Sequence, residues 1–192
     1  MESAYAAAVL DLYLNARKGR WLLHGLDVGV VDSPSAMKIR DTWEDRHIEW
    51  AAVDVKPNPH DGYVETWEGL ISGMEWADFD FILNISTMEH CAACGDSFER
   101  AINTLRGALT PEGVMVLTMP VGVFADFEAF RQYTVSQVHR LLSSFQVIDE
   151  RFWRWGGEHF ENCREEDVLG CVYGQTNNAR NASGVGAWTL AR

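Results

Sequence analysis

Hydrophobic residues along this chain follow two recurring patterns, and each pattern predicts a different kind of element. Short apolar runs bounded by glycine, proline or acidic residues predict strands. Longer stretches with apolar residues three or four positions apart predict amphipathic helices. Strands are predicted over residues 21–29, 48–55, 63–67, 79–86, 114–120, 145–153 and 184–191. Helices are predicted over 3–16, 96–109 and 134–145, with a loose one over 68–77 and another beginning at Ser33 and Pro34.

The run FDFILNISTMEHC, residues 79–91, is the most informative for the fold class. Its apolar part has almost no polar alternation, which is typical of a strand covered on both faces in a parallel sheet. Strands and helices also alternate along the chain. The pattern therefore predicts an α/β fold with a mainly parallel open sheet and helices on both faces. Ligands of such sheets bind outside the carboxyl ends of the strands, where the cluster Ser-Thr-Met-Glu-His would lie.

Composition and charge narrow the functions that this fold can have. With 192 residues, the chain is expected to form a single domain, 1–192, with an N-terminal helix in 1–19 and a core over 20–192. The net charge of −12 argues against a nucleic-acid partner. The chain has no apolar run of membrane-spanning length, and acids interrupt the N-terminal apolar stretch, so we expect a cytoplasmic protein without a signal peptide. The 8 Trp residues also suit a ligand wall, a homo-oligomer or a protein partner.

The four cysteines offer a weak metal or redox signal. Cys91 and Cys94 form a C-x-x-C pair, which can be half of a zinc site or a redox pair. Neither a second C-x-x-C nor an H-x-x-x-H follows. We therefore expect ordinary buried or half-buried thiols and no metal site, with metal binding or redox chemistry as the alternative.

Polar residues follow three of the predicted strands, at the point where each strand ends. Asp27 and Gly29 end the first strand, and the glycine permits a tight turn. Asp54 closes the second, about 20 residues after that turn, where an acid can accept hydrogen bonds from ribose hydroxyls. Glu89 and His90 follow the fourth strand and can take a proton or orient a substrate. Each residue alone also has an ordinary structural explanation, but their order places all of them on one rim.

Several segments together resemble the class I S-adenosylmethionine-dependent methyltransferases. The likeness runs from about residue 20 to the C-terminus, and it implies a Rossmann-like fold with an antiparallel C-terminal strand. The segments that resemble the family's motifs are LDVGVVDS for the first turn, AAVDVKP for the ribose-binding strand, DFDFILNISTMEH for the fourth strand, and AINTLRGALTPEGVMVLTMPVG for the following helix, turn and fifth strand.

A narrower resemblance is to small methyltransferase-like proteins found among sugar and cell-envelope biosynthesis functions. The segments that carry it are DVGVVDSPSA, ISTMEH, LTMPVG and FRQYTVSQVHRLLSSF. Linked motifs in the same order indicate the fold more strongly than they indicate a substrate.

The resemblance implies roles at the cofactor end of the site. Asp27 and Gly29 would line the methionine end of S-adenosylmethionine, and Asp54 would hold its ribose. Ile85 and Ser86 would border the cofactor.

The resemblance also implies roles at the acceptor end. Glu89 and His90 would face the methyl acceptor, with His90 able to act as a base. Arg131 and Tyr133, in FRQYT, would lie beyond the fifth strand and contact the substrate.

Two functions of different classes follow from this reading. The first is methyl transfer from S-adenosylmethionine to a hydroxyl of a sugar or small metabolite. The second is a catalytically inactive methyltransferase-like fold that serves as a binding or structural subunit. Methyl transfer is the leading hypothesis, and the turn after Gly29 fits the second function too, because Val30, Val31 and Asp32 stand where the family is often richer in glycine. A nucleotide-binding oxidoreductase is a weaker third reading, because the G-x-G-x-x-G fingerprint is missing.

Overall fold

An eight-stranded sheet forms the centre of the molecule. The computed structural model describes residues 1–16, 22–31, 47–174 and 182–192. The predicted turn residue Asp32 and the helix expected from Ser33 and Pro34 lie outside these residues. Across the sheet the strands follow the order β3 (Glu65–Glu68), β2 (His47–Asp54), β1 (Leu22–Val28), β4 (Phe79–Ile85), β5 (Leu109–Pro120), β10 (Gly184–Ala191), β8 (Gln146–Trp155) and β9 (Phe160–Cys163).

The sheet is parallel from β3 to β5, and the C-terminal strand breaks this pattern. β10 runs antiparallel to both of its neighbours, β5 and β8. All strand predictions made from the apolar runs coincide with strands of the sheet, shifted by a few residues at their ends. The mainly parallel α/β sheet with an antiparallel C-terminal strand is therefore confirmed.

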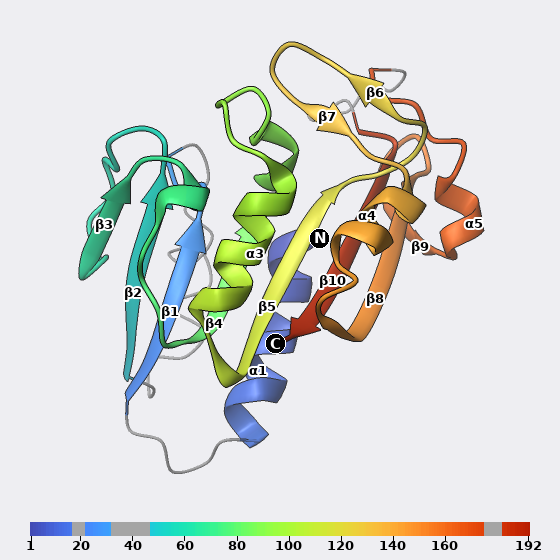
Figure 1. Ribbon diagram of the computed structural model, residues 1–192. Helices are drawn as coiled ribbons and strands as arrows, with labels where there is room; N and C mark the ends of the chain where they lie inside the picture. Colours follow the sequence, from blue (N-terminus) through green and yellow to red (C-terminus); the bar gives the residue numbers. More distant parts are fainter. Residues whose placement is uncertain (17–21, 32–46, 175–181) are drawn as a thin grey trace.

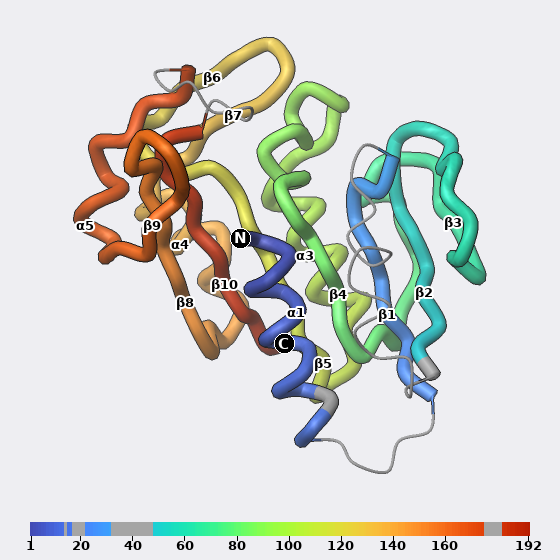
Figure 2. The backbone as a smooth tube through the Cα atoms, turned by 180° about the vertical axis from the view of Figure 1, so that it is seen from behind, coloured from blue at the N-terminus to red at the C-terminus, as the bar shows by residue number. Residues whose placement is uncertain are grey.

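Helices cover both faces of the sheet (Figures 1 and 2). α1 (Glu2–Ala16) packs against β4, β5 and β10 on one face. α3 (Phe98–Ala108) and α4 (Val135–Leu141) lie on the other face, and the short α5 (Glu165–Val168) contacts β8. None of the helices in the described residues is long and apolar enough to cross a membrane.

The uniform burial of β4 follows from this double cover. All seven of its residues are buried. Phe81 and Leu83 point into the apolar cluster that includes Leu10 of α1, whereas Ile82 belongs to the cluster that includes Ile102 of α3. A strand between two helical layers has no solvent-facing side, so its sequence lacks alternation.

Side-chain caps explain where the helices α3 and α4 begin. The Ser97 side chain accepts a hydrogen bond from the backbone N–H of Arg100 at the start of α3. Thr134 and Gln137 form a reciprocal capping box at the start of α4. Both arrangements satisfy backbone N–H groups that have no partner within a helix.

The loose helix predicted over 68–77 is wrong. Only a single 3-10 turn, η2 (Ile71–Gly73), forms there, and Leu70 and Met74 on either side are extended. Ile71 and Met74 are nevertheless buried, so their apolar spacing reflects a loop that packs against the core. The sequence pattern also missed β9, α5 and the hairpin of β6 (Ala125–Asp126) and β7 (Arg131–Gln132).

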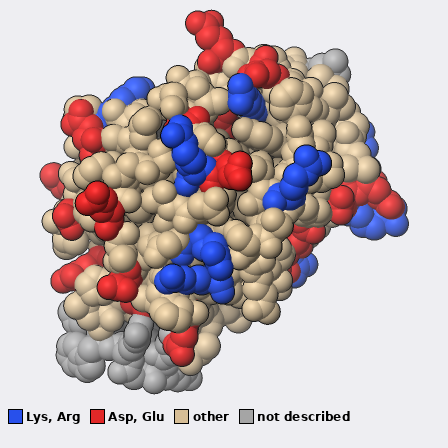
Figure 3. All heavy atoms as spheres, viewed as in Figure 1, with Lys and Arg blue, Asp and Glu red and all other residues tan. Residues whose placement is uncertain are grey.

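Charged side chains of both signs are interspersed over the face seen in Figure 3.

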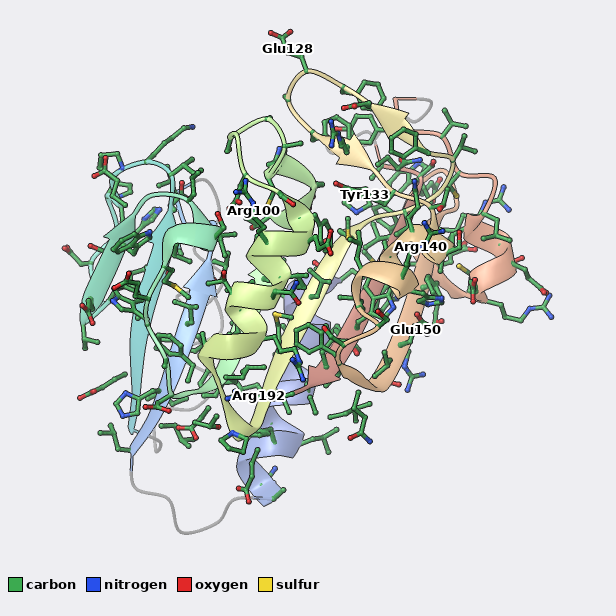
Figure 4. All side chains as sticks on the ribbon, viewed as in Figure 1. Arg100, Glu128, Tyr133, Arg140, Glu150 and Arg192 are labelled. Carbon is green, nitrogen blue, oxygen red and sulfur yellow. The ribbon has the colours of Figure 1, made fainter. Side chains whose placement is uncertain are left out.

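The β6–β7 hairpin projects beyond the end of the sheet, with Glu128 at its tip and Tyr133 at its base (Figure 4). This hairpin stands beside the carboxyl end of β5. The other parallel strands end at the same edge of the sheet.

Candidate functional site

A cavity of about 470 Å³ opens along this edge of the sheet. Cavities of this size hold small molecules and cofactors. It begins near the ends of β2 and β3, crosses β1 and β4, and reaches the start of β10. Six of the residues predicted from the sequence line it together, namely Gly29, Asp54, Ile85, Ser86, Glu89 and His90.

Gly29 turns the chain at the end of β1 in a way that few other residues allow. Its φ of 79° lies in the left-handed region, and a Cβ atom there would lie 2.2 Å from Oγ1 of Thr87. The Thr87 hydroxyl donates to the carbonyl of Val28 at 3.0 Å, which ties β4 to this turn. The bulky Val30 is fully buried and is not part of the cavity lining, so it does not block the space in front of Gly29.

Asp54 connects the turn after β1 to the turn after β2. Its two carboxylate oxygens accept hydrogen bonds from the backbone N–H groups of Val31 at 3.0 Å and Lys56 at 3.1 Å. Each oxygen of a carboxylate can accept more than one hydrogen bond. Asp54 is therefore held in place and keeps acceptor capacity for a ligand.

Asp27 is not part of the cavity lining. The side chain is fully buried and accepts a hydrogen bond from the Tyr63 hydroxyl at 2.7 Å. The expected contact of Asp27 with a cofactor remains a prediction.

Glu2 is a lining residue that the sequence reasoning missed. Its side chain is only 3% exposed, although it belongs to the first turn of α1. Oε1 accepts hydrogen bonds from the Ser86 hydroxyl at 2.6 Å and the Thr118 hydroxyl at 3.0 Å. Nothing in the local sequence marks this glutamate, because its partners lie more than 80 residues away.

Glu89 presents a second buried carboxyl group to the cavity. It is 3% exposed, and its Oε2 atom has no hydrogen-bond partner among the described residues. Burial raises the pKa of Glu89 to about 8, because a charged carboxylate loses its hydration there. At neutral pH the cavity thus contains a carboxyl group that is largely protonated.

His90 is oriented by the neighbouring hairpin. Its Nδ1 atom lies 2.8 Å from the carbonyl oxygen of Ala129, which can only accept, so Nδ1 carries the hydrogen. In the neutral ring Nε2 then has the free lone pair and can take up a proton. The ring also lies 6.0 Å from that of Phe130, measured between centroids.

An aromatic wall, made of Phe127, Phe130 and Tyr173, closes the far end. The ring centroids of Phe130 and Tyr173 are 4.2 Å apart, and Phe127 stacks on Phe130 at 4.6 Å. Phe130 and Tyr173 line the cavity. Burial, followed by the negative charge of Glu89, raises the pKa of Tyr173. The wall joins residues more than 40 positions apart in the sequence, so no local sequence signal predicted it.

Arg131 and Tyr133, predicted to contact a substrate, do not line the cavity. Arg131 donates to Asp126 across the hairpin at 2.9 Å, and this bond raises the pKa of its guanidinium. Tyr133 is buried and packs edge-on against Phe98 of α3 at 5.2 Å. The two residues hold the hairpin in place, and their expected contact with an acceptor gains no support from this arrangement.

Cys91 and Cys94 both line the cavity as free thiols. Burial raises the pKa of Cys91 to about 12, which keeps it protonated and unreactive near neutral pH.

Outside the cavity, side chains of His139, Glu150 and Glu165 lie near one another. There His139 Nε2 is 2.5 Å from Oε1 of Glu150, and the same oxygen accepts from the buried Trp188, so the group has a structural explanation.

Solved structures of methyltransferases share this arrangement of strands and helices. The MccD protein matches at 12% identity over 96% of each chain, with a TM-score of 0.64. Coclaurine N-methyltransferase, bound to N-methylheliamine and SAH, matches at 13% identity over 96% of this chain and 70% of that one, with a TM-score of 0.61. The N-methyltransferase NodS from Bradyrhizobium japonicum, in complex with SAH, matches at 14% identity over 96% and 84% of the two chains, with a TM-score of 0.56.

The chain has the class I methyltransferase fold. At these identities the likeness establishes the fold alone. No protein-family model matches the chain, and no curated protein matches it significantly.

The turn of the methyltransferase fold at Gly29 should be intolerant of any side chain. Gly29→Ala introduces both a strained φ and a collision with Thr87, so we expect a loss of more than ~2 kcal/mol in the free energy of unfolding. Gly95→Ala is the matched control, because Gly95 has a similar φ of 82° with nothing within 4 Å of the added Cβ. Urea unfolding of both variants would measure the difference, and equal losses would contradict the tight contact.

Glu89 should make stability depend on pH. Its folded pKa of about 8 lies above the usual 4.5, so the folded protein binds this proton more tightly than the unfolded chain. The free energy of unfolding should therefore fall as pH rises from 4.5 to about 8 and then level off. Glu89→Gln lacks this decline, so its stability relative to wild type should increase by roughly 1.4 kcal/mol per pH unit in that window. Urea unfolding at several pH values would test this; parallel curves would disprove it.

Proposed function

We propose that this chain transfers a methyl group from S-adenosylmethionine to a hydroxyl of a small metabolite, such as a sugar. The observation that carries this proposal is the convergence of Gly29, Asp54, Ser86, Glu89 and His90 on one cavity at the carboxyl edge of the sheet. The fold is that of methyltransferases, and neighbours with this fold have been solved with S-adenosylmethionine or SAH bound. This likeness supports methyl transfer as the chemistry of the cavity.

The lining suits a nucleoside at the β2 end of the cavity. Asp54 can accept hydrogen bonds from the two ribose hydroxyls while its backbone partners hold it still. Val55, Leu70 and Ile71 line the same end and provide an apolar surface for a flat base. Gly29 lets the backbone approach the ligand closely, because no Cβ intervenes.

The charge of the lining favours a cation over a phosphate. The carboxylates of Glu2, Asp54 and Asp96 line the cavity with the single ammonium of Lys56, while Glu89 is largely protonated at neutral pH. S-adenosylmethionine carries a sulfonium and an ammonium group, whereas dinucleotide cofactors carry two phosphates that carboxylates would repel. This lining argues against the oxidoreductase considered from the sequence.

His90 is the residue best placed to act as a base. The cofactor would supply an electrophilic methyl group. As the acceptor oxygen bonded to that methyl carbon, the carbon–sulfur bond would break and leave SAH. The hydroxyl proton would pass to Nε2 of His90, because Nδ1–H is bound to Ala129. Phe130 and Tyr173 provide the apolar wall against which the acceptor would be held, so that oxygen, methyl carbon and sulfur stay in line.

Asp54 provides the test for cofactor binding. Asp54→Asn removes the charge and keeps the shape, so the affinity for SAH should fall roughly 10- to 100-fold in isothermal titration calorimetry. Asp61→Asn is the matched control, because Asp61 is exposed and lies outside the lining. If wild-type protein binds neither S-adenosylmethionine nor SAH at millimolar concentration, the chain is better explained as a binding or structural subunit.

His90 provides the test for catalysis. His90→Ala should lower the rate of SAH formation with hydroxyl acceptors by ~10²–10⁴-fold. It should leave the calorimetric affinity for SAH unchanged, because the ring faces the acceptor. His159→Ala, at a histidine that is 72% exposed, serves as the control. Turnover equal to wild type in His90→Ala would exclude this residue as the base.

A further inference from the structure

The N-terminal helix contributes a carboxylate to the cavity from the side opposite the proposed base. α1 packs against β4, β5 and β10, and its Glu2 lines the cavity next to Ser86. Glu89 and His90 belong to the 3-10 turn η3 (Met88–His90), which contacts α3 on the other face of the sheet. The two buried carboxyl groups therefore approach the cavity from different sides of β4.

The Glu2 carboxylate is fixed in one orientation by two strands. Ser86 follows β4 and Thr118 belongs to β5, and both hydroxyls donate to Oε1. Ser86 also has a positive φ of 51°, which a non-glycine residue adopts at an energetic cost. A strained residue that orients a buried acid at a cavity wall is typical of a binding site rather than of a core that only needs to be filled.

The position of Asp54 defines which end of a bound cofactor would reach Glu2. If the ribose lies against Asp54 with its base toward Leu70, the amino-acid end extends across Gly29 toward Ser86. That end carries an ammonium group next to a carboxylate. A buried carboxylate is a strong partner for an ammonium, since charge-assisted hydrogen bonds gain strength away from water.

We propose that Glu2 binds the ammonium group of the cofactor's amino-acid end, so that α1 forms part of the cofactor site. This inference rests on the proposed use of S-adenosylmethionine and assigns a specificity-determining role to a residue outside the strand-end motifs. Ser86 and Thr118 act as positioning residues for the Glu2 carboxylate. The amino-acid group, and not only the nucleoside, thus becomes a feature that the cavity recognises.

The test pairs a neutral variant with a ligand that lacks the ammonium. Glu2→Gln keeps an oxygen that can accept from Ser86 and Thr118, and thermal unfolding would verify that it folds. The ligands are SAH and its deamino analogue, which retains the nucleoside, the sulfur and the carboxylate. Wild-type protein should bind SAH roughly 10- to 100-fold more tightly than the analogue, and Glu2→Gln should bind the two within about threefold.

Asp11→Asn is the control for loss of one negative charge from the same helix, because Asp11 is exposed and lies outside the cavity. It should keep the wild-type preference for SAH. A preference in Glu2→Gln equal to that of wild type would overturn the assignment of Glu2, as would wild-type protein that binds both ligands equally. Wild-type protein that binds neither ligand would overturn the proposed function itself, which distinguishes the two failures.

Discussion

The parallel register of β1, β2 and β4 is the constraint on which the site depends. Val28 lies opposite both Val53 of β2 and Asn84 of β4, so the next residues of the three strands are Gly29, Asp54 and Ile85. Parallel strands all end at the same edge, and each connection must leave the sheet there. Polar residues placed directly after an apolar run therefore meet in space without any local contact between them in the sequence.

Acidic groups at this edge are costly to bury in their charged form. Glu2 and Glu89 are each 3% exposed, and the burial that raises the pKa of Glu89 reflects the cost of an ionised carboxylate without water. Hydrogen bonds from Ser86 and Thr118 offset part of that cost at Glu2. A cationic ligand would offset more, which links the stability of the protein to the ligand that the cavity accepts.

The sheet was predictable from the sequence because burial on two faces leaves a clear apolar run, as in residues 79–85. The strand-end residues Gly29, Asp54 and Glu89 were predictable for the same reason, since each lies at or within four residues of the end of such a run. Glu2 was not, because its position in the cavity depends on how α1 packs across β4 and β5. The loose helix over 68–77 failed because its apolar residues are buried by tertiary contacts without helical backbone.

A crystal structure of the full chain grown with SAH would test the account most directly. The account predicts one ligand along the carboxyl edge, with ribose hydroxyls within hydrogen-bond distance of Asp54, the sulfur near Gly29 and Ser86, and open space between the sulfur and Nε2 of His90. Density for SAH elsewhere on the surface, or crystals from millimolar SAH that show only water in this cavity, would contradict it.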